Sequence, residues 1–250
     1  MLCINSPSTD VYFNLAAEEY LLKNHSGNIF MIWQGKNAVV LGKHQNVRAE
    51  IDVRLAGEKQ ISIARRYSGG GTVYHDLGNI NLTFIENQDK IDFSKYIKSI
   101  IGFLSAIGIE ANADERLGIN IDRLKISGSA QCIYKKRVLY HCTLLYSSNL
   151  ELLNASLNGE PENRIKEPEN KQVYTVKSVK SKVTNISDHL KNSPDIGKFK
   201  EKLLGFYLGN DPGSRLYQFG KDEEENINRL KTGKYMTPEW IFGRHEKGLI

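Results

Sequence analysis

The stretch RRYSGGGTVYHDLGN, residues 65–79, places three adjacent glycines between an arginine pair and a strand-like run. Glycine is costly inside helices and strands because it loses the most backbone freedom on folding. The run at 69–71 therefore predicts a loop, and the β-branched and aromatic residues from Thr72 to Tyr74 predict a strand after it. Three missing Cβ atoms also let a ligand lie against the main chain, whose N–H groups can hold an anion.

A second run of small residues, LKISGSAQ at 124–131, resembles the first in composition. Lys125 stands before it in a strand-like alternation, as Arg66 stands before the glycines. Arginine offers a planar fork and lysine a point charge, so two such platforms suit a long, thin ligand that carries a phosphate. A tight loop and a solvated strand lysine explain the same residues, so these two patterns alone leave the ligand open.

The rest of the chain predicts one α+β domain, with a mixed, mainly antiparallel β-sheet and helices packed on its outer face. The length of 250 residues and 40% apolar content suit a single full core. Strands are expected at 28–34, 38–42, 61–66, 72–76, 79–85, 118–121, 125–134 and 137–146. The expected helices are 14–24, 50–59, 93–107, 187–190, 196–208 and 222–230. Two strand pairs are expected around the turns 35–37 and 77–78, and a polar loop at 158–170.

Charge and cysteine content favour a soluble protein of a reducing compartment, expected to be cytoplasmic. The net charge of +5 is modest, and only three cysteines occur, without metal-ligand spacing. No secretory signal and no apolar run long enough to span a bilayer is seen. Neither nucleic acid nor a membrane is an expected partner, because nucleic-acid binding would need basic residues interleaved with exposed aromatics on one face, and the short cluster of Lys177, Lys180 and Lys182 suits an acidic protein domain equally well.

The stretch RRYSGGGTVYHDLGNINLTF resembles the signature of lipoate–protein ligases and lipoyltransferases, in the biotin/lipoate ligase superfamily. LKISGSAQ with HCTLL (141–145) is similar to the second block of that family. FNLAAEE (13–19), WQGKNAVVLGKHQN (33–46), VKSVKSKVTNI (176–186) and EWIFG (239–243) are similar to its other landmarks, in the same order. The resemblance implies the biotin/lipoate ligase catalytic-domain fold over residues 1–250, without the small C-terminal accessory domain of bacterial ligases.

A two-step reaction is implied by this resemblance. The carboxylate of lipoate attacks the α-phosphate of ATP, giving lipoyl-AMP, and a lysine of an acceptor then displaces AMP. The implied substrates are ATP with Mg²⁺ and lipoate or lipoyl-AMP. The implied acceptors are apo-lipoyl domains of 2-oxoacid dehydrogenase complexes or the glycine cleavage H protein, with a separate small accessory protein as a further partner.

Site residues follow from the matched blocks. Lys125 is the expected catalytic residue, because a fixed ammonium stabilises the charge that develops at phosphorus more than it stabilises the ground state. The residues expected to bind lipoyl-adenylate or ATP are Arg66, Ser68, Gly69, Gly70, Gly71, Val73, Tyr74, Asn79, Ser127, Gly128, Ala130 and Thr143. The lipoyl pocket is expected to contain Leu15, Ala17, Trp33, His75 and His141. Metal ligands cannot be assigned from the sequence.

Three departures from the family pattern keep other functions open. An Asn-Asp pair usually precedes the lysine block, but 115–125 has none. Cys142 replaces the glycine of His-Gly-Thr, and the chain ends soon after EWIFG. A lipoyltransferase that takes a preformed lipoyl-nucleotide and a non-catalytic lipoyl-binding protein are therefore alternatives. A cysteine nucleophile, Cys132 or Cys142, is a further one, although strand neighbours point to opposite faces and His141 is poorly placed to activate Cys142.

Overall fold

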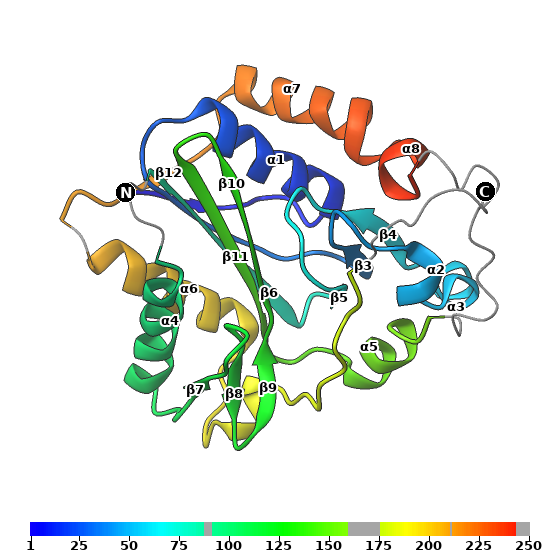
Figure 1. Cartoon of the computed structure of the whole chain (residues 1–250). Helices are drawn as coiled ribbons and strands as arrows, with labels where there is room; N and C mark the ends of the chain where they lie inside the picture. Colours follow the sequence, from blue (N-terminus) through cyan, green and yellow to red (C-terminus); the bar gives the residue numbers. More distant parts are fainter. Residues whose placement is uncertain (88–91, 160–175, 211, 244–250) are drawn as a thin grey trace.

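The computed structural model describes residues 1–87, 92–159, 176–210 and 212–243. Within them the chain forms one six-stranded sheet and two three-stranded sheets, surrounded by helices (Figure 1). In spatial order, the large sheet contains β10 (Ser129–Tyr134), β11 (Arg137–Leu145), β6 (Asn79–Asn87), β2 (Ile29–Trp33), β1 (Leu2–Asn5) and β12 (Arg215–Tyr217). The first four strands are antiparallel to one another, and β1 is parallel to both β2 and β12.

The two small sheets contain β4 (Ser62–Arg65), β3 (Ala38–Leu41) and β5 (Val73–His75), and β7 (Asn112–Ala113), β8 (Ile119–Ile121) and β9 (Leu124–Ser127). Neither of the strand pairs expected around short turns is formed. The strands β2 and β3 belong to different sheets, and so do β5 and β6. A continuous apolar run predicts burial but does not specify a partner. The turn after β2 is held from outside, because Lys36 N donates to Thr9 O at 2.9 Å.

The helices are α1 (Val11–Asn24), α2 (Val47–Glu50), α3 (Val53–Glu58), α4 (Ser94–Ala106), α5 (Leu150–Ser156), α6 (Ile196–Gly209), α7 (Lys221–Leu230) and α8 (Pro238–Ile241), with single turns η2 (Ile186–His189) and η3 (Lys231–Tyr235). The helix expected at 50–59 is divided into α2 and α3. The Asp52 carboxylate accepts from Leu55 N at 2.8 Å and starts α3 as its N-cap, while Ile51 is extended. Most of the loop expected at 158–170 lies outside the described residues.

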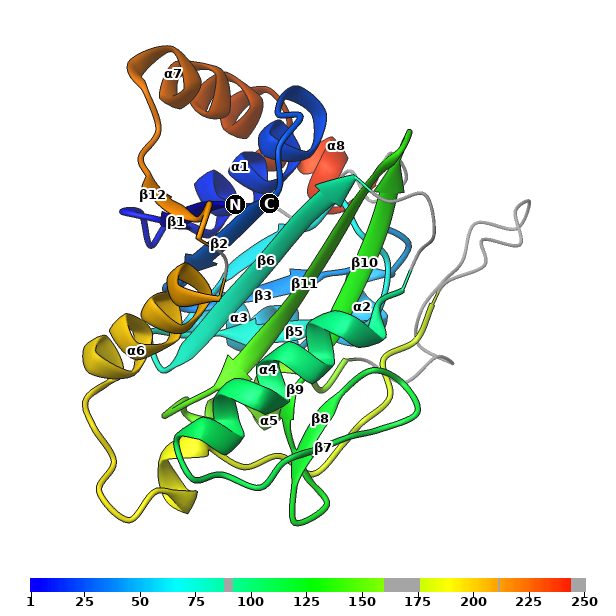
Figure 2. The ribbon, with the colours of Figure 1, turned by 90° about the vertical axis from the view of Figure 1, so that its left-hand side faces the viewer.

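Alternate residues of β2 pack into two different cores. Ile29, Met31 and Trp33 pack with α1, while Phe30 and Ile32 pack with α4 and α6. Figure 2 shows α4 and α6 lying across one face of the large sheet. The α+β class with a mixed, mainly antiparallel sheet is therefore confirmed, with helices on both faces. None of the helices in the described ranges is long and apolar enough to cross a membrane.

Candidate functional site

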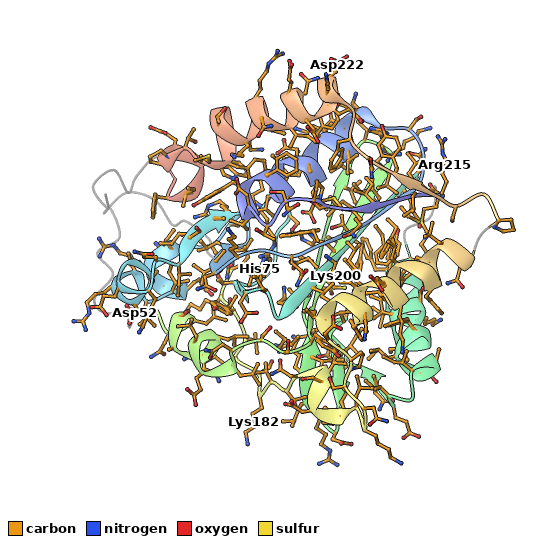
Figure 3. All side chains as sticks on the ribbon, turned by 180° about the vertical axis from the view of Figure 1, so that it is seen from behind. Asp52, His75, Lys182, Lys200, Arg215 and Asp222 are labelled. Carbon is orange, nitrogen blue, oxygen red and sulfur yellow. The ribbon has the colours of Figure 1, made fainter. Side chains whose placement is uncertain are left out.

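A cavity of about 600 Å³ lies between the glycine loop 69–71 and the start of β10. It is the place where α1 and strands of all three sheets meet, and Figure 3 shows His75 of β5 in the interior of the molecule. Most of the site residues expected from the sequence line it. They are Leu15, Trp33, Arg66, Gly70, Gly71, Val73, His75, Lys125, Gly128, Ala130, His141 and Thr143.

A second cavity, of about 490 Å³, adjoins the first and shares Lys125, Gly128 and Thr143 with it. It contains two more of the expected residues, Tyr74 and Ser127. The side chains of β5 alternate, so Tyr74 lies on the wall of the second cavity and His75 on that of the first. The two cavities together offer an elongated space with Lys125 near its middle.

Four expected residues do not lie on either wall. Ala17 is fully buried in the core around α1. Because it is two positions from Leu15 on the helix, its side chain points away from the cavity. Asn79 is also fully buried and reaches the cavity only through Asn81, whose Oδ1 accepts from Asn79 Nδ2 at 3.1 Å. Ser68 and Gly69 lie behind the wall and hold its residues in place.

The glycine loop is braced from inside by Arg66. Nε and Nη2 of Arg66 donate to Gly69 O at 3.1 and 2.6 Å, and Nη2 also donates to Gly71 O at 2.6 Å. Nη1 donates to Val40 O at 3.0 Å. Burial lowers the pKa of Arg66 to about 10, which leaves the guanidinium charged at neutral pH. Because the carbonyls face Arg66, the loop keeps its N–H groups for another partner: those of Gly69, Gly70 and Gly71 have no acceptor among the described residues.

Two of the three glycines are required by geometry. Gly70 has φ of +83°, and a Cβ there would lie 3.0 Å from Arg66 Nη2. A Cβ on Gly71 would lie 2.9 Å from Ser178 Oγ, whereas one on Gly69 would meet nothing within 4 Å. The glycine run thus allows a left-handed turn at Gly70 and a close approach of Ser178 at Gly71. It also leaves the main chain accessible to a ligand.

Lys125 extends from β9 across the small residues of the second platform. Its Cε lies 3.8 Å from the position of a Cβ on Gly128. The backbone of Lys125 is fixed on both sides, since its N–H donates to Lys182 O at 2.8 Å and its C=O accepts from Thr184 N at 3.1 Å. Its ammonium makes no hydrogen bond or ion pair within the described ranges. Asp114, which also lines the cavity, attracts this ammonium electrostatically.

A buried polar chain that sequence reasoning missed runs from α1 to the glycine loop. Glu18 Oε2 lies 3.0 Å from His141 Nδ1, and His141 Nε2 lies 2.7 Å from Ser68 Oγ. Arg66 Nε donates to Ser68 Oγ at 3.0 Å. Glu18 and His141 both line the cavity. Glu18 stands three positions after Leu15, on the same face of the helix, so helical spacing within FNLAAEE was the signal available.

A second group that the sequence reasoning missed, around Ser178, lies against the end of the glycine loop. Ser178 Oγ accepts from Thr72 N at 2.7 Å and from Gln45 Nε2 at 3.1 Å, and Ser178 N donates to Glu50 Oε1 at 3.1 Å. Gln45 Oε1 in turn accepts from Gly42 N and Thr72 Oγ1, both at 2.8 Å. Ser178 therefore holds its segment over both cavities, and it lies in the VKSVKSKVTNI block of the sequence.

The inner end of the cavity is apolar and aromatic. Trp33 and His75 meet edge to face with ring centroids 5.3 Å apart, and Leu15, Val40 and Val73 complete this end. Burial, with the positive charge of Arg66, lowers the pKa of His75 to about 3, so its imidazole is neutral at physiological pH. Such an end accommodates a hydrocarbon chain and not a second phosphate.

The cysteines are unsuited to nucleophilic catalysis. Burial raises the pKa of Cys142 and that of Cys132 to about 12, so both are protonated thiols at neutral pH. Cys142 packs into the core beneath the large sheet, whereas His141 faces Glu18 of α1. The geometry thus agrees with a small buried apolar role for Cys142.

Known proteins resemble this chain over most of its length. The model of the lipoyl protein ligase A/B catalytic domain matches residues 10–207. Lipoate–protein ligase 1 of Staphylococcus aureus is 34% identical over 248 residues, which are 97% of this chain and 73% of that relative.

Two solved structures share the fold. A bi-partite lipoate protein ligase from Thermoplasma acidophilum, studied with its E2 lipoyl domain, superposes with a TM-score of 0.78 at 24% identity, covering 100% of this chain and 98% of that one. A lipoate–protein ligase A bound with ATP gives a TM-score of 0.77 at 24% identity, covering 97% of each chain.

Proposed function

The chain belongs to the lipoyl protein ligase A/B catalytic domain family, and from this premise we propose that it attaches lipoate to a lysine of an acceptor lipoyl domain. ATP first activates the carboxylate as lipoyl-AMP with release of pyrophosphate, and the lysine amine then displaces AMP. The observation that carries the proposal is the convergence, in one cavity, of an apolar end, glycine N–H groups without acceptors among the described residues and the ammonium of Lys125.

Each part of the cavity has a chemical task in this proposal. The acyl chain lies at the end formed by Trp33 and His75, and the acyl phosphate lies against Gly70 and Gly71. Lys125 faces the α-phosphorus, where negative charge grows in the transition state, and its ammonium makes no hydrogen bond or ion pair with the described residues that would compete with a phosphate oxygen. The nucleoside is assigned to the second cavity, beside Tyr74 and Ser127.

Magnesium would enter with ATP. No group of three metal-ligating side chains occurs within the described ranges. Mg²⁺ usually takes only one or two protein carboxylates and fills its shell with phosphate and water oxygens. Asp114 and Glu115, on the cavity wall with Lys125, fit that requirement. Asp114 Oδ1 accepts from Gly118 N at 2.7 Å, so Asp114 holds an acidic group beside the stretch that lacks the Asn-Asp pair.

Whether the chain carries out the activation step itself is the point at which the two enzymatic alternatives differ. The absent Asn-Asp pair favours a transferase that uses preformed lipoyl-AMP. It stays a prediction that residues 1–250 act as a single catalytic domain without an accessory domain. The corresponding partner, to be added to the reaction, is a separate small accessory protein.

The test gives the purified chain an apo-lipoyl domain with lipoate and Mg²⁺-ATP, or with premade lipoyl-AMP, and weighs the acceptor by mass spectrometry. Product in both reactions is the expected result. Product from lipoyl-AMP alone would identify a transferase. Product in neither, with lipoate binding seen by calorimetry, would identify a lipoyl-binding protein and reject the proposal.

A further inference from the structure

The hydrogen-bonded chain that links Glu18, His141 and Ser68 is arranged so that His141 can accept a proton. Glu18 is 4% exposed, and its carboxylate also accepts from Thr83 Oγ1 at 2.5 Å and from Trp33 Nε1 at 3.3 Å. An ionised carboxylate can only accept hydrogen bonds, so Nδ1 of His141 must be the donor in their contact. This leaves His141 Nε2 as the basic nitrogen.

Ser68 is compatible with this tautomer from the other side. Its Oγ accepts from Arg66 Nε at 3.0 Å, which leaves its hydroxyl hydrogen able to donate to His141 Nε2 at 2.7 Å. Every bond of the chain thus runs in one direction, from the glycine loop to the carboxylate of Glu18. A carboxylate that orients an imidazole and stabilises its protonated form is the arrangement by which histidine serves as a general base.

The charged and titratable groups around His141 make Glu18 necessary for this task. Arg66 lies on one side and is joined to His141 through Ser68. His75, on another strand, is neutral because burial and Arg66 lower its pKa to about 3. Among the described residues, Glu18 is the anion in direct contact with His141, at 3.0 Å, so it is placed to offset the charge that His141 gains.

We propose that His141 accepts the proton released when the acceptor lysine attacks the acyl-adenylate, and that Glu18 is the positioning residue that makes His141 a base. The new C–N bond forms while the bond between the acyl carbon and the phosphate oxygen breaks, and AMP leaves with that electron pair. The proton of the attacking amine moves to Nε2, which exchanges its hydrogen bond with Ser68 for this proton. The inference rests on the proposed function and concerns its second step only.

The test uses premade lipoyl-AMP with two nucleophiles, an apo-lipoyl domain and hydroxylamine. Hydroxylamine is unprotonated at neutral pH and reacts with acyl phosphates without a protein base. In Glu18→Gln, kcat for the lipoyl domain should fall about 100-fold, the scale of general base catalysis. KM should stay unchanged, and hydroxamate formation should stay within about twofold of wild type.

The neighbouring Glu19→Gln is the matched control, since Glu19 contacts Lys23, Lys234 and Tyr235 instead of His141. It should leave both nucleophiles unaffected below its unfolding temperature. A parallel loss of amide and hydroxamate in Glu18→Gln would overturn the inference, because the glutamate would then only shape the cavity. Undiminished amide formation would also overturn it. No product from the wild type with either nucleophile would instead reject the proposed function, and the inference with it.

Discussion

The two walls of the cavity use their polar groups in opposite ways. On the glycine-loop wall, every nitrogen of the Arg66 guanidinium donates to the chain, and Ser178 joins three further residues. On the facing wall, the Lys125 ammonium makes no hydrogen bond or ion pair with any residue that the structure describes. The first wall is therefore held by its own hydrogen bonds, while the second carries a charge for which we propose a ligand as the partner. Mutations on the glycine-loop wall should therefore lower stability, and mutation of Lys125 on the facing wall should lower catalysis.

The largest expected effect is on catalysis, from Lys125→Ala. We expect acyl transfer to fall by about 100-fold or more, the scale seen when one preorganised electrostatic donor is removed. The thermal midpoint should hardly change, because the lost ammonium makes no hydrogen bond or ion pair with the described residues and its attraction to Asp114 is not a direct contact. Steady-state kinetics and thermal unfolding measure the two quantities. Lys202→Ala, an exposed lysine of α6, is the control, and unchanged turnover in Lys125→Ala would remove the contrast between the walls.

The next effect is on stability, from Gly70→Ala. We expect a loss of about 1–2 kcal/mol, because an alanine at φ of +83° is strained and its Cβ would lie 3.0 Å from Arg66 Nη2. Gly69→Ala should change the free energy of unfolding by less than about 0.5 kcal/mol, since open space surrounds that position. Urea unfolding of the two variants gives the comparison. Equal losses at 69 and 70 would show that the loop is not shaped as described.

A smaller effect is expected from Ser178→Ala. The change removes the acceptor of Thr72 N and Gln45 Nε2, which should cost about 1 kcal/mol. Ser181→Ala is the matched control, because Ser181 also lines both cavities but makes no hydrogen bond with the described residues. Urea unfolding should rank the two. A larger loss at 181 than at 178 would contradict the role given to Ser178.

The smallest effect is expected from Cys142→Ser. Because burial raises the pKa of the Cys142 thiol to about 12, it is not a nucleophile, and transfer to an acceptor domain should stay within about twofold of wild type. Mass spectrometry of the wild-type chain during turnover is the complementary measurement. An acyl-cysteine adduct on the wild type, together with an inactive variant, would restore the thioester alternative.

The sequence predicted which residues share a cavity better than it predicted the sheets. Residues of the glycine loop and of LKISGSAQ lie within short blocks, so their convergence on one cavity could be expected block by block. The partners of β2 and β3 could not, because both strands are apolar throughout and pairing is decided by segments far away in the chain. Glu18 was missed for a related reason, since a glutamate in an amphipathic helix is usually solvated. Its contact with His141 joins residues 123 positions apart.

The pairing of β1 with β12 has a consequence for synthesis in the cell. Leu2–Asn5 lies between β2 and Arg215–Tyr217, a strand that leaves the ribosome long after β1. Until then β1 has one free edge, an exposed template for other strands. Nascent chains that stall before residue 215 should therefore aggregate or recruit chaperones, while chains released beyond it bury that edge.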